Sequence, residues 1–482
     1  MTLPMPVDIR WPLFQTEIGL IVLLVTAMLL DIFMPNDEKR GKILANTGLV
    51  GVAALLAALC VSKDNLGSSL NGTFVQDGLA FFYKILFLLA GFFTIFMARE
   101  YQARLKRGHG EFILLILLSL IGMLFLASAN DFLLFFISLE ILSVSLYIMT
   151  SYLKDEDASI EAGVKYLVLG ALSTAVFLFG LSFIYGSTGS TSYLEIQKRL
   201  SFLSSVPVPF IFGMILVVSS LGFKIAAVPF HLWAPDIYEG APAPVASYLA
   251  IGSKAAGFAA LLRLMMTVFA PAQNSLTLLF GALGALTILY GNLGAIPQTN
   301  LKRLLGYSSI GHAGYLLIGL AAFSYTGKEA VLYYLLSYLF STAGAFLVLV
   351  AVSRSAPSDE IAAWAGLSQK SPLLAAGMLL SLLSLAGVPP LAGFFGKFYV
   401  LMAGVKAGLL WLVFIGAINV ITSLYYYLKV IKVIYVDKPP DERPMPVTVS
   451  QKAFQYFSIF GILFFGIFQG PLVNWIAVIF SR

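Results

Sequence analysis

Cysteine and charge are both scarce in this 482-residue chain, and each scarcity excludes a class of protein. The single cysteine, Cys60, rules out an intrachain disulfide, a CxxC metal site and an iron–sulfur cluster held by this chain alone. Three scattered histidines do not make a metal site. Charged residues are only 11% of the chain, well below the level of soluble domains. We therefore expect no redox centre and no bound cofactor in this chain.

Polar stretches long enough to build a separate soluble domain are also absent. Hydrophobic residues make up 59% of the chain, and the mean hydropathy is +0.90. The 30 Lys and Arg residues outnumber the 24 Asp and Glu residues, so the net charge is positive. In a membrane protein this excess reflects basic cytoplasmic loops and not nucleic-acid binding. The sequence predicts an all-α polytopic membrane protein, a single membrane domain over residues 1–482.

Fourteen apolar segments are long enough to cross the hydrocarbon core of a bilayer. The first should stay as a helix, because no basic region precedes it and no small-residue cleavage pattern follows it. Three helices fill residues 1–110, and the last helix is residues 452–480. The segments cover residues 17–34, 43–61, 79–98, 111–127, 131–150, 163–186, 209–230, 243–269, 275–296, 303–323, 329–352, 372–403, 409–436 and 452–480.

The basic residues of the loops are divided unevenly between the two sides of the membrane. Loops that follow odd-numbered segments hold 17 Lys and Arg residues, and the opposite side holds seven. Lys and Arg are retained on the cytoplasmic side during insertion. Both termini are therefore predicted to face the outer, periplasmic side.

Six basic residues remain inside the apolar runs: Lys84, Lys165, Lys224, Lys254, Arg263 and Lys397. A cation at the bilayer centre costs roughly 2.5 to 3.5 kcal/mol, so it needs a partner, a water path or a function. Lys84 and Arg263 lie near outer segment ends, and we expect their long side chains to reach the interface.

Lys165 and Lys254 differ in depth. Lys165 lies near the inner end of segment 6, four residues after Glu161, so both an exposed helical ion pair and a functional role stay open. Lys254 is close to the middle of segment 8, too deep for easy escape to either surface. A functional role is the favoured interpretation of Lys254.

Lys224 and Lys397 each lie beside residues that break a helix. Pro229 follows Lys224 in segment 7, and Pro389 and Pro390 precede Lys397 in segment 12. Proline removes a helical donor, so segments 7 and 12 are predicted to be broken helices. Irregular backbone at membrane depth is tolerated only inside protein or beside water. A lysine there is a candidate for an ion pathway, with a merely kinked helix as the alternative.

Two further ionisable residues lie deep in their segments. Glu140 is near the middle of segment 5, where a carboxylate and deep lysines lower the cost of burying one another. Burial disfavours the charged form of a lysine, which lets it load and release protons. A static ion pair of Glu140 is the alternative. His312 lies in segment 10 among Ser308, Ser309 and Gly311, and both a proton relay and a packing role remain open.

Segments 4–8 and 9–13 are predicted to be two copies of a five-helix unit, covering residues 111–270 and 275–436. Segment 7 then aligns with segment 12, so the two broken helices correspond. Because five is odd, the copies have inverted topology. Such repeats place the pathway at their interface near the membrane midplane.

Several runs of sequence resemble the antiporter-like subunits of respiratory complex I, the proton-pumping NADH:quinone oxidoreductase. The runs are FKIAAVPFHLWAPDIYEGAP (residues 223–242), SKAA (253–256), NLKRLLGYSS (300–309) and the Pro-Pro segment ending in GKFY (396–399). The lysine at position 397 resembles the N-type branch of this family, whereas the M type typically has a glutamate there. The chain leaves no room for the long lateral helix of the L type.

The resemblance implies a role in proton translocation for six residues. Glu140 and Lys224 would be the paired acid and lysine of a first half-channel. The others would be a further axial lysine (Lys165), the central connecting lysine (Lys254), a polar link (His312) and the terminal protonatable site of a second half-channel (Lys397).

The resemblance also implies partners and a location. The chain would lie in a bacterial cytoplasmic (inner) membrane with M-type, L-type and small membrane subunits. FMN, iron–sulfur clusters and quinone would be bound by partner subunits. The alternatives are a subunit of a cation/proton antiporter and a hydrogenase-linked or photosynthetic relative of complex I.

Overall fold

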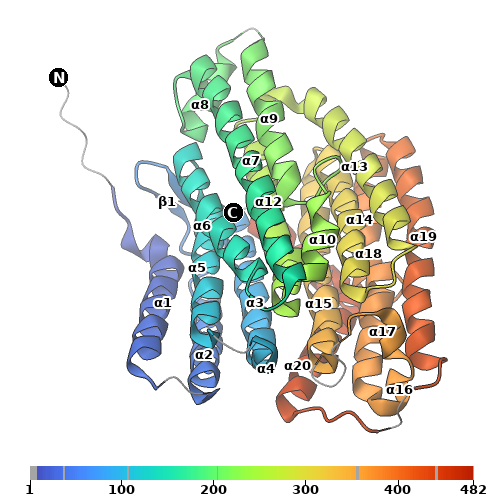
Figure 1. Ribbon diagram of the computed structural model, residues 1–482. Helices are drawn as coiled ribbons and strands as arrows, with labels where there is room; N and C mark the ends of the chain where they lie inside the picture. The colour runs from blue at the N-terminus through green and yellow to red at the C-terminus, as the bar shows by residue number, and fades with distance from the viewer. Residues whose placement is uncertain are drawn as a thin grey trace.

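A computed structural model describes residues 8–35, 38–105, 108–203, 205–353, 358–439 and 443–480, and its helices run roughly side by side (Figure 1). Lys106, Arg107, Arg354 and Arg482, which the loop charge count includes, lie outside the described residues. The all-α prediction is confirmed. The described strands, β1 (Gly67–Ser69) and β2 (Phe74–Gln76), form one short antiparallel hairpin.

The first part of the chain supplies twelve α-helices and a π-helical turn. They are α1 (Gln15–Phe33), α2 (Glu38–Val61), α3 (Gly78–Glu100), α4 (Gln102–Leu105), α5 (His109–Ser128), α6 (Phe132–Thr150), α7 (Asp157–Thr188), α8 (Tyr193–Ser201), α9 (Val208–Lys224), α10 (Trp233–Gly240), α11 (Ala243–Tyr248), the π-helical η2 (Leu249–Ser253) and α12 (Lys254–Met266).

The second part supplies nine more α-helices. They are α13 (Gln273–Ala295), α14 (Leu301–Ala321), α15 (Tyr325–Val352), α16 (Leu367–Lys370), α17 (Pro372–Ala386), α18 (Ala392–Lys406), α19 (Leu410–Tyr435), α20 (Val449–Ile467) and α21 (Gln469–Phe480). Three short 3₁₀ turns complete the elements: η1 (Trp11–Phe14), η3 (Ala270–Ala272) and η4 (Ile361–Trp364).

Eleven spans within the described residues are long and apolar enough to cross a membrane, or twelve if the bent pair of α20 and α21 is one span. The predicted count of fourteen membrane spans exceeds the number found in the structure, and the difference arises at three places. α9 and α17 have 17 and 15 residues, because the chain breaks after each of them, and α20 meets α21 at 84°. Fourteen crossings therefore stay a prediction.

The predicted interruption of segment 7 begins directly after Lys224, where α9 ends. Ala226 adopts a positive φ of 57°, and helix resumes only at Trp233. Two side chains satisfy the freed backbone: Trp233 Nε1 donates to the Phe223 carbonyl (2.9 Å), and Thr287 Oγ1 accepts from the Val228 amide (3.0 Å). The break is therefore stable inside protein, as backbone at membrane depth must be.

The predicted interruption of segment 12 separates α17 from α18. Gly387 ends α17 with φ 89°, a left-handed conformation that favours glycine. The Ser384 hydroxyl accepts from the Gly393 amide at 3.1 Å and so closes the loop. Lys224 thus precedes its break, whereas Lys397 follows its break on α18.

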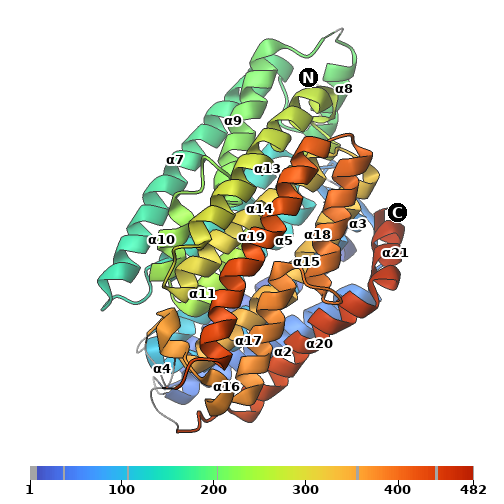
Figure 2. The same cartoon turned by 90° about the vertical axis from the view of Figure 1, so that its right-hand side faces the viewer.

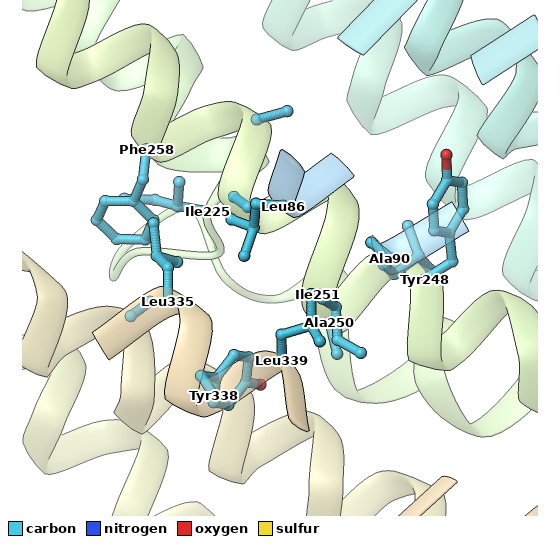
Figure 3. Packing of buried hydrophobic residues seen from close by; sticks show 14 of the residues in the cluster. Leu86, Ala90, Ile225, Tyr248, Ala250, Ile251, Phe258, Leu335, Tyr338 and Leu339 are labelled. Carbon is cyan, nitrogen blue, oxygen red and sulfur yellow. The ribbon is translucent and has the colours of Figure 1, made fainter. Parts of the chain in front are cut away.

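Lys254 lies directly after the π-helical turn η2, which the sequence did not predict. Figure 3 shows Ala250 and Ile251 of this turn facing Leu339 and Tyr338 of α15, with Leu86 of α3 close by. All of these side chains are buried. The apolar packing fixes the turn and thereby the position of Lys254.

The loops divide between two opposite faces of the helix bundle. At the bottom of Figure 1 lie α4, α16 and the start of α20. The β1–β2 hairpin and α8 lie towards the top. Figure 2 shows α20 rising from the bottom face towards α21. The elements at the bottom follow predicted segments 3, 11 and 13, so these three loops share one face, as their odd numbers require.

Candidate functional site

Lys224 and Glu140 come together at the end of α9, but they form no direct ion pair. The Lys224 ammonium donates to the Ser143 hydroxyl at 2.6 Å, and Lys224 is only 4% exposed. Glu140, three residues before Ser143 on α6, accepts a hydrogen bond from Thr174 Oγ1 at 2.8 Å. The acid and the lysine that the sequence predicts to be paired are therefore each bound by a different hydroxyl group.

Aromatic rings enclose the Lys224 ammonium. It lies 5.4 Å from the ring centroid of Tyr147 and 5.9 Å from that of Tyr166, close enough for cation–π attraction. The Lys224 ammonium thus lies among aromatic rings, with the Ser143 hydroxyl as its hydrogen-bond partner.

Lys254 has neutral partners. Its ammonium donates to the carbonyl and to the hydroxyl of Ser309 on α14. Tyr238 shares the same hydroxyl at 3.0 Å, and the Tyr338 ring lies 5.9 Å from the ammonium. This arrangement connects α12 to α14, the helix that carries His312.

His312 joins three helices through tyrosine hydroxyls. Its Nδ1 lies 2.7 Å from the Tyr334 hydroxyl on α15, and its Nε2 lies 3.2 Å from the Tyr427 hydroxyl on α19. Tyr427 also pairs with Ser308. Both ring nitrogens of this buried histidine therefore have partners that can give and accept a proton.

Lys397 also has neutral partners. Its ammonium donates to the Ala386 carbonyl at the end of α17 (2.9 Å) and to Ser423 on α19 (3.3 Å). The ring of Tyr315 lies 5.0 Å from the ammonium. Tyr315 is stacked 6.5 Å from Tyr334, the partner of His312. The second break is thereby adjacent to the histidine network.

Lys165 lies outside this buried series. Its side chain is 41% exposed and pairs with Glu161 at 2.6 Å and with Asp236 at 2.8 Å. Asp236 also pairs with Arg303, which reaches Glu239. The exposed helical ion pair, one of the two possibilities left open by the sequence, is present and extends into a surface network.

Lys84 and Arg263 are buried inside the chain and bind carboxylates near the outer ends of their segments, and their reaching the interface stays a prediction. Lys84 is fully buried, 2.6 Å from the Glu17 carboxylate of α1, and also donates to Gln76. Arg263 is buried and binds Asp77 through two nitrogens. The reason is tertiary, because α1 and the end of the β1–β2 hairpin cover these cations and supply carboxylates.

Two kinds of buried cation therefore exist among the described residues. Lys84 and Arg263 have carboxylates within ion-pair distance, whereas Lys224, Lys254 and Lys397 bind hydroxyls and carbonyls. A carboxylate holds a buried lysine in its charged form, and a neutral partner does not. The three lysines with neutral partners are thus chemically able to alternate between charged and neutral states.

The sequence did not single out several hydroxyl groups that bind these lysines, Glu140 and His312. They are the hydroxyl groups of Ser143, Thr174, Tyr334, Tyr427 and Ser423. Ser and Tyr are common in membrane helices, so one sequence offers no signal that separates them from packing residues. The i, i+4 spacing of Tyr334 and Tyr338, both facing His312, is the one pattern that points to the network.

The structure is a bundle of apolar helices in which two are interrupted beside a buried lysine. This combination is typical of the class of antiporter-like membrane subunits. Sequence comparison agrees with this class. The chain belongs to the NADH:quinone oxidoreductase/Mrp antiporter transmembrane family, whose model matches residues 129–423.

Relatives cover nearly the whole chain. The chain is 41% identical to NADH-quinone oxidoreductase subunit N of Desulforamulus reducens over 467 residues, 97% of each protein. Its structure is similar to a chain of respiratory complex I from Thermus thermophilus, with a TM-score of 0.81 and 34% identity over 95% of this chain and 98% of that one.

A second solved structure shares the fold alone. A chain of the Mrp complex from Dietzia sp. DQ12-45-1b has a TM-score of 0.85 but only 19% identity, over 98% of this chain and 97% of that one.

Proposed function

We propose that this protein is the proton-translocating N-type membrane subunit of an NADH:quinone oxidoreductase. Its relative from Desulforamulus reducens carries that subunit name, and the relationship extends over 97% of the chain. The observation that supports translocation most directly is the series of three buried lysines with neutral partners.

The proposed path runs from Lys224 through Lys254 and His312 to Lys397. Glu140 lies near Lys224 without pairing to it directly, so a small movement of α6 against α9 changes the attraction between the two charges. A weaker attraction favours release of the lysine proton towards Lys254. The tyrosine and serine hydroxyls around His312 then relay the proton towards Lys397.

Lys165 has a different role in this proposal. Its exposed pairs with Glu161 and Asp236 bring α7 and α10 together next to the first break. It therefore acts as a positioning residue at one end of the path and not as a carrier on the buried axis.

The proposal includes partners, cofactors and orientation. The chain works with the other membrane subunits of the complex, and FMN, iron–sulfur clusters and quinone are bound by partner subunits. Both termini face the periplasmic side of the bacterial inner membrane, as the loop charges indicate.

The test uses the assembled complex in membrane vesicles. Lys224→Ala and Lys397→Ala should each abolish proton pumping by this subunit and lower coupled NADH:quinone activity. Lys198→Ala is the control, because Lys198 is exposed on α8 and its ion-pair partner among the described residues is the exposed Glu195. Unimpaired pumping and activity in both variants would contradict the proposal.

A cation/proton antiporter is the second candidate, favoured by the likeness in fold to an Mrp complex chain. Gentle purification followed by absorbance spectroscopy separates the two candidates. Flavin and iron–sulfur absorbance in the co-purifying subunits supports the oxidoreductase. Their absence, together with Na⁺/H⁺ exchange in vesicles, supports the antiporter.

A further inference from the structure

A cavity of about 730 Å³ lies outside the lysine series, where α5 packs against both α1 and α6. Its volume is typical of a ligand pocket, for which the usual range is about 300 to 1,000 Å³. None of the residues that line it belongs to the proposed proton path. The cavity therefore needs an explanation of its own.

The walls of the cavity are apolar. The side chains that form them include Leu24 and Met28 of α1, Leu114 and Leu118 of α5, and Ile148 of α6. Met28, Leu118 and Ile148 are exposed, so the cavity opens to the outside of the chain. At membrane depth, an apolar cavity that opens outwards is accessible to lipid.

The depth of the cavity corresponds to one leaflet of the bilayer. On α5 its lining residues run from Glu111, in the first turn, to Leu118. Seven residues of helix span about 10 Å, whereas the hydrocarbon core is about 30 Å thick. A partner helix that crosses the membrane would need a groove along the whole of this thickness. The limited depth favours lipid chains that enter from one side.

The mouth of the cavity carries charges of both signs. Glu111 at the start of α5 and Lys154 in the turn between α6 and α7 both line it, and both are exposed. Neither side chain has an ion-pair partner in the described part of the chain. Asp155 lines the same mouth. An apolar cavity with an ammonium and a carboxylate at its entrance matches an amphipathic molecule whose head group is zwitterionic.

The two sides of the mouth are held together by Tyr152. Its hydroxyl donates to the Gly108 carbonyl at 2.6 Å, and its ring lies edge-on to Phe112. Gly108 has a positive φ of 69°, and a Cβ atom there would collide with the Tyr152 hydroxyl. The turn that carries Lys154 is thereby fixed against the first turn of α5, which carries Glu111.

We propose that this cavity binds a phospholipid whose head group carries a primary ammonium, with its acyl chains between α1 and α6. Lys154 binds the lipid phosphate, and the Glu111 carboxylate accepts hydrogen bonds from the lipid ammonium. On the proposed orientation, the lipid comes from the cytoplasmic leaflet. The site goes beyond the proposed function, because no group of the proton path takes part in it.

Photolabelling in vesicles tests the position of the lipid. The assembled complex is reconstituted into equal amounts of phosphatidylethanolamine and phosphatidylglycerol, with a trace of phosphatidylethanolamine that carries a diazirine in its acyl chain. Peptides that contain residues 111–118 should be labelled. Leu118→Trp should lower this labelling at least about fivefold, because the large indole ring occupies the cavity.

Leu133→Trp is the matched control for the position. Leu133 is exposed at the other end of α6, does not line the cavity, and should leave the labelling unchanged. Labelling that persists in Leu118→Trp would show only the lipid that surrounds any membrane protein, and would overturn the proposal. No labelling of residues 111–118 in the unsubstituted complex would also overturn it, because a partner subunit would then cover the cavity.

A reversal of charge tests the head group. Phosphatidylglycerol with the same diazirine has the phosphate but no ammonium, so it should label residues 111–118 about threefold less than phosphatidylethanolamine does. Glu111→Lys should remove or reverse this preference, because two ammonium groups then face the phosphate.

Glu360→Lys is the control for the head group. Glu360 is an exposed carboxylate in the loop after α15 and does not line the cavity, so this variant should keep the preference. Equal labelling by the two lipids in the unsubstituted complex would overturn the proposal. A preference that survives in Glu111→Lys would overturn it as well.

Discussion

At the scale of single residues, the partner of a buried lysine separates cations that are paired with a carboxylate from those that are not. Lys84 is held by Glu17, whereas Lys224 is held by the Ser143 hydroxyl. Depth in the membrane does not make this distinction, because Lys84 is as buried as Lys224. The distinction depends on whether a carboxylate lies within ion-pair distance.

Removal of the Ser143 hydroxyl should impair pumping without affecting assembly. A hydrogen bond to a charged group contributes about 1.5 to 3 kcal/mol, so Ser143→Ala should disfavour the protonated Lys224 in this position roughly tenfold or more. The measurement is the number of protons pumped per NADH oxidised in vesicles. Ser145→Ala is the control, because in the described part of the chain the Ser145 side chain bonds the Ile141 carbonyl of its own helix and no lysine. Identical ratios in the two variants would contradict the role of Ser143.

Loss of the Glu17 carboxylate should instead reduce stability. Glu17→Leu leaves the Lys84 ammonium buried without its anionic partner, which costs about 3 to 5 kcal/mol. The expected result is a lower thermal unfolding temperature of the purified complex and less of this chain in membranes. The double variant Glu17→Leu with Lys84→Met should recover most of the stability, because two apolar residues need no pairing. A single variant as stable as the double variant would show that this ion pair is not needed.

At the scale of helices, the two interruptions place their lysines in opposite ways. α9 ends at Lys224, so this lysine sits at the last turn before the break. Lys397 lies inside α18 and reaches back to the Ala386 carbonyl at the end of α17. Both interruptions satisfy their backbone through neighbouring side chains, which is why they persist at membrane depth.

Substitution of Gly387 should disturb the second break and its lysine together. Alanine at φ 89° costs about 1 to 2 kcal/mol, and its Cβ atom would lie 3.0 Å from Lys397 Cδ. Gly387→Ala should therefore lower both thermal stability and pumping.

Gly408→Ala is the matched control for this prediction. Gly408 also has a positive φ, of 74°, but a Cβ atom there would meet no atom within 4 Å. It should cost similar stability and leave pumping unchanged. If both variants pump normally, the conformation at Gly387 does not determine the position of Lys397.

At the scale of the whole molecule, the bundle collects polar groups from distant parts of the chain into one buried series. Ser143 of α6, Ser309 of α14 and Ser423 of α19 each bind a different lysine. The helices α12, α14 and α15 are buried along nearly their whole length, so they screen the middle of the series from lipid. Loops lie at the two opposite ends of the bundle.

The predicted orientation can be tested with a reagent that does not cross the membrane. In a Cys60→Ser chain, Lys198→Cys on α8 should be labelled in intact cells, because α8 lies on the side assigned to the periplasm. Lys154→Cys, exposed between α6 and α7, should be labelled only after the cells are opened. Labelling of Lys154→Cys alone in intact cells would reverse the orientation.

Part of this architecture could be predicted from the sequence because it depends on local chemistry. Apolar runs predict membrane helices, and Pro229, Pro389 and Pro390 predict the two interruptions. The depth of Lys254 and Lys397 within their apolar runs is enough to mark both lysines as candidates for function. The contacts of Lys84 could not be predicted, because Glu17 and Gln76 reach it from other elements.

The sequence by itself determined that this chain lies in a membrane, which helices are broken and which cations are deep, because hydropathy and proline act within a single segment. Only the tertiary structure decided that Lys84 and Arg263 have carboxylates within ion-pair distance, whereas Lys224, Lys254 and Lys397 bind hydroxyls and carbonyls. It also decided that residues of α1, α5 and α6 line one cavity. The physical reason is that the charge state of a buried group depends on which side chains surround it, and those come from helices far apart in the chain.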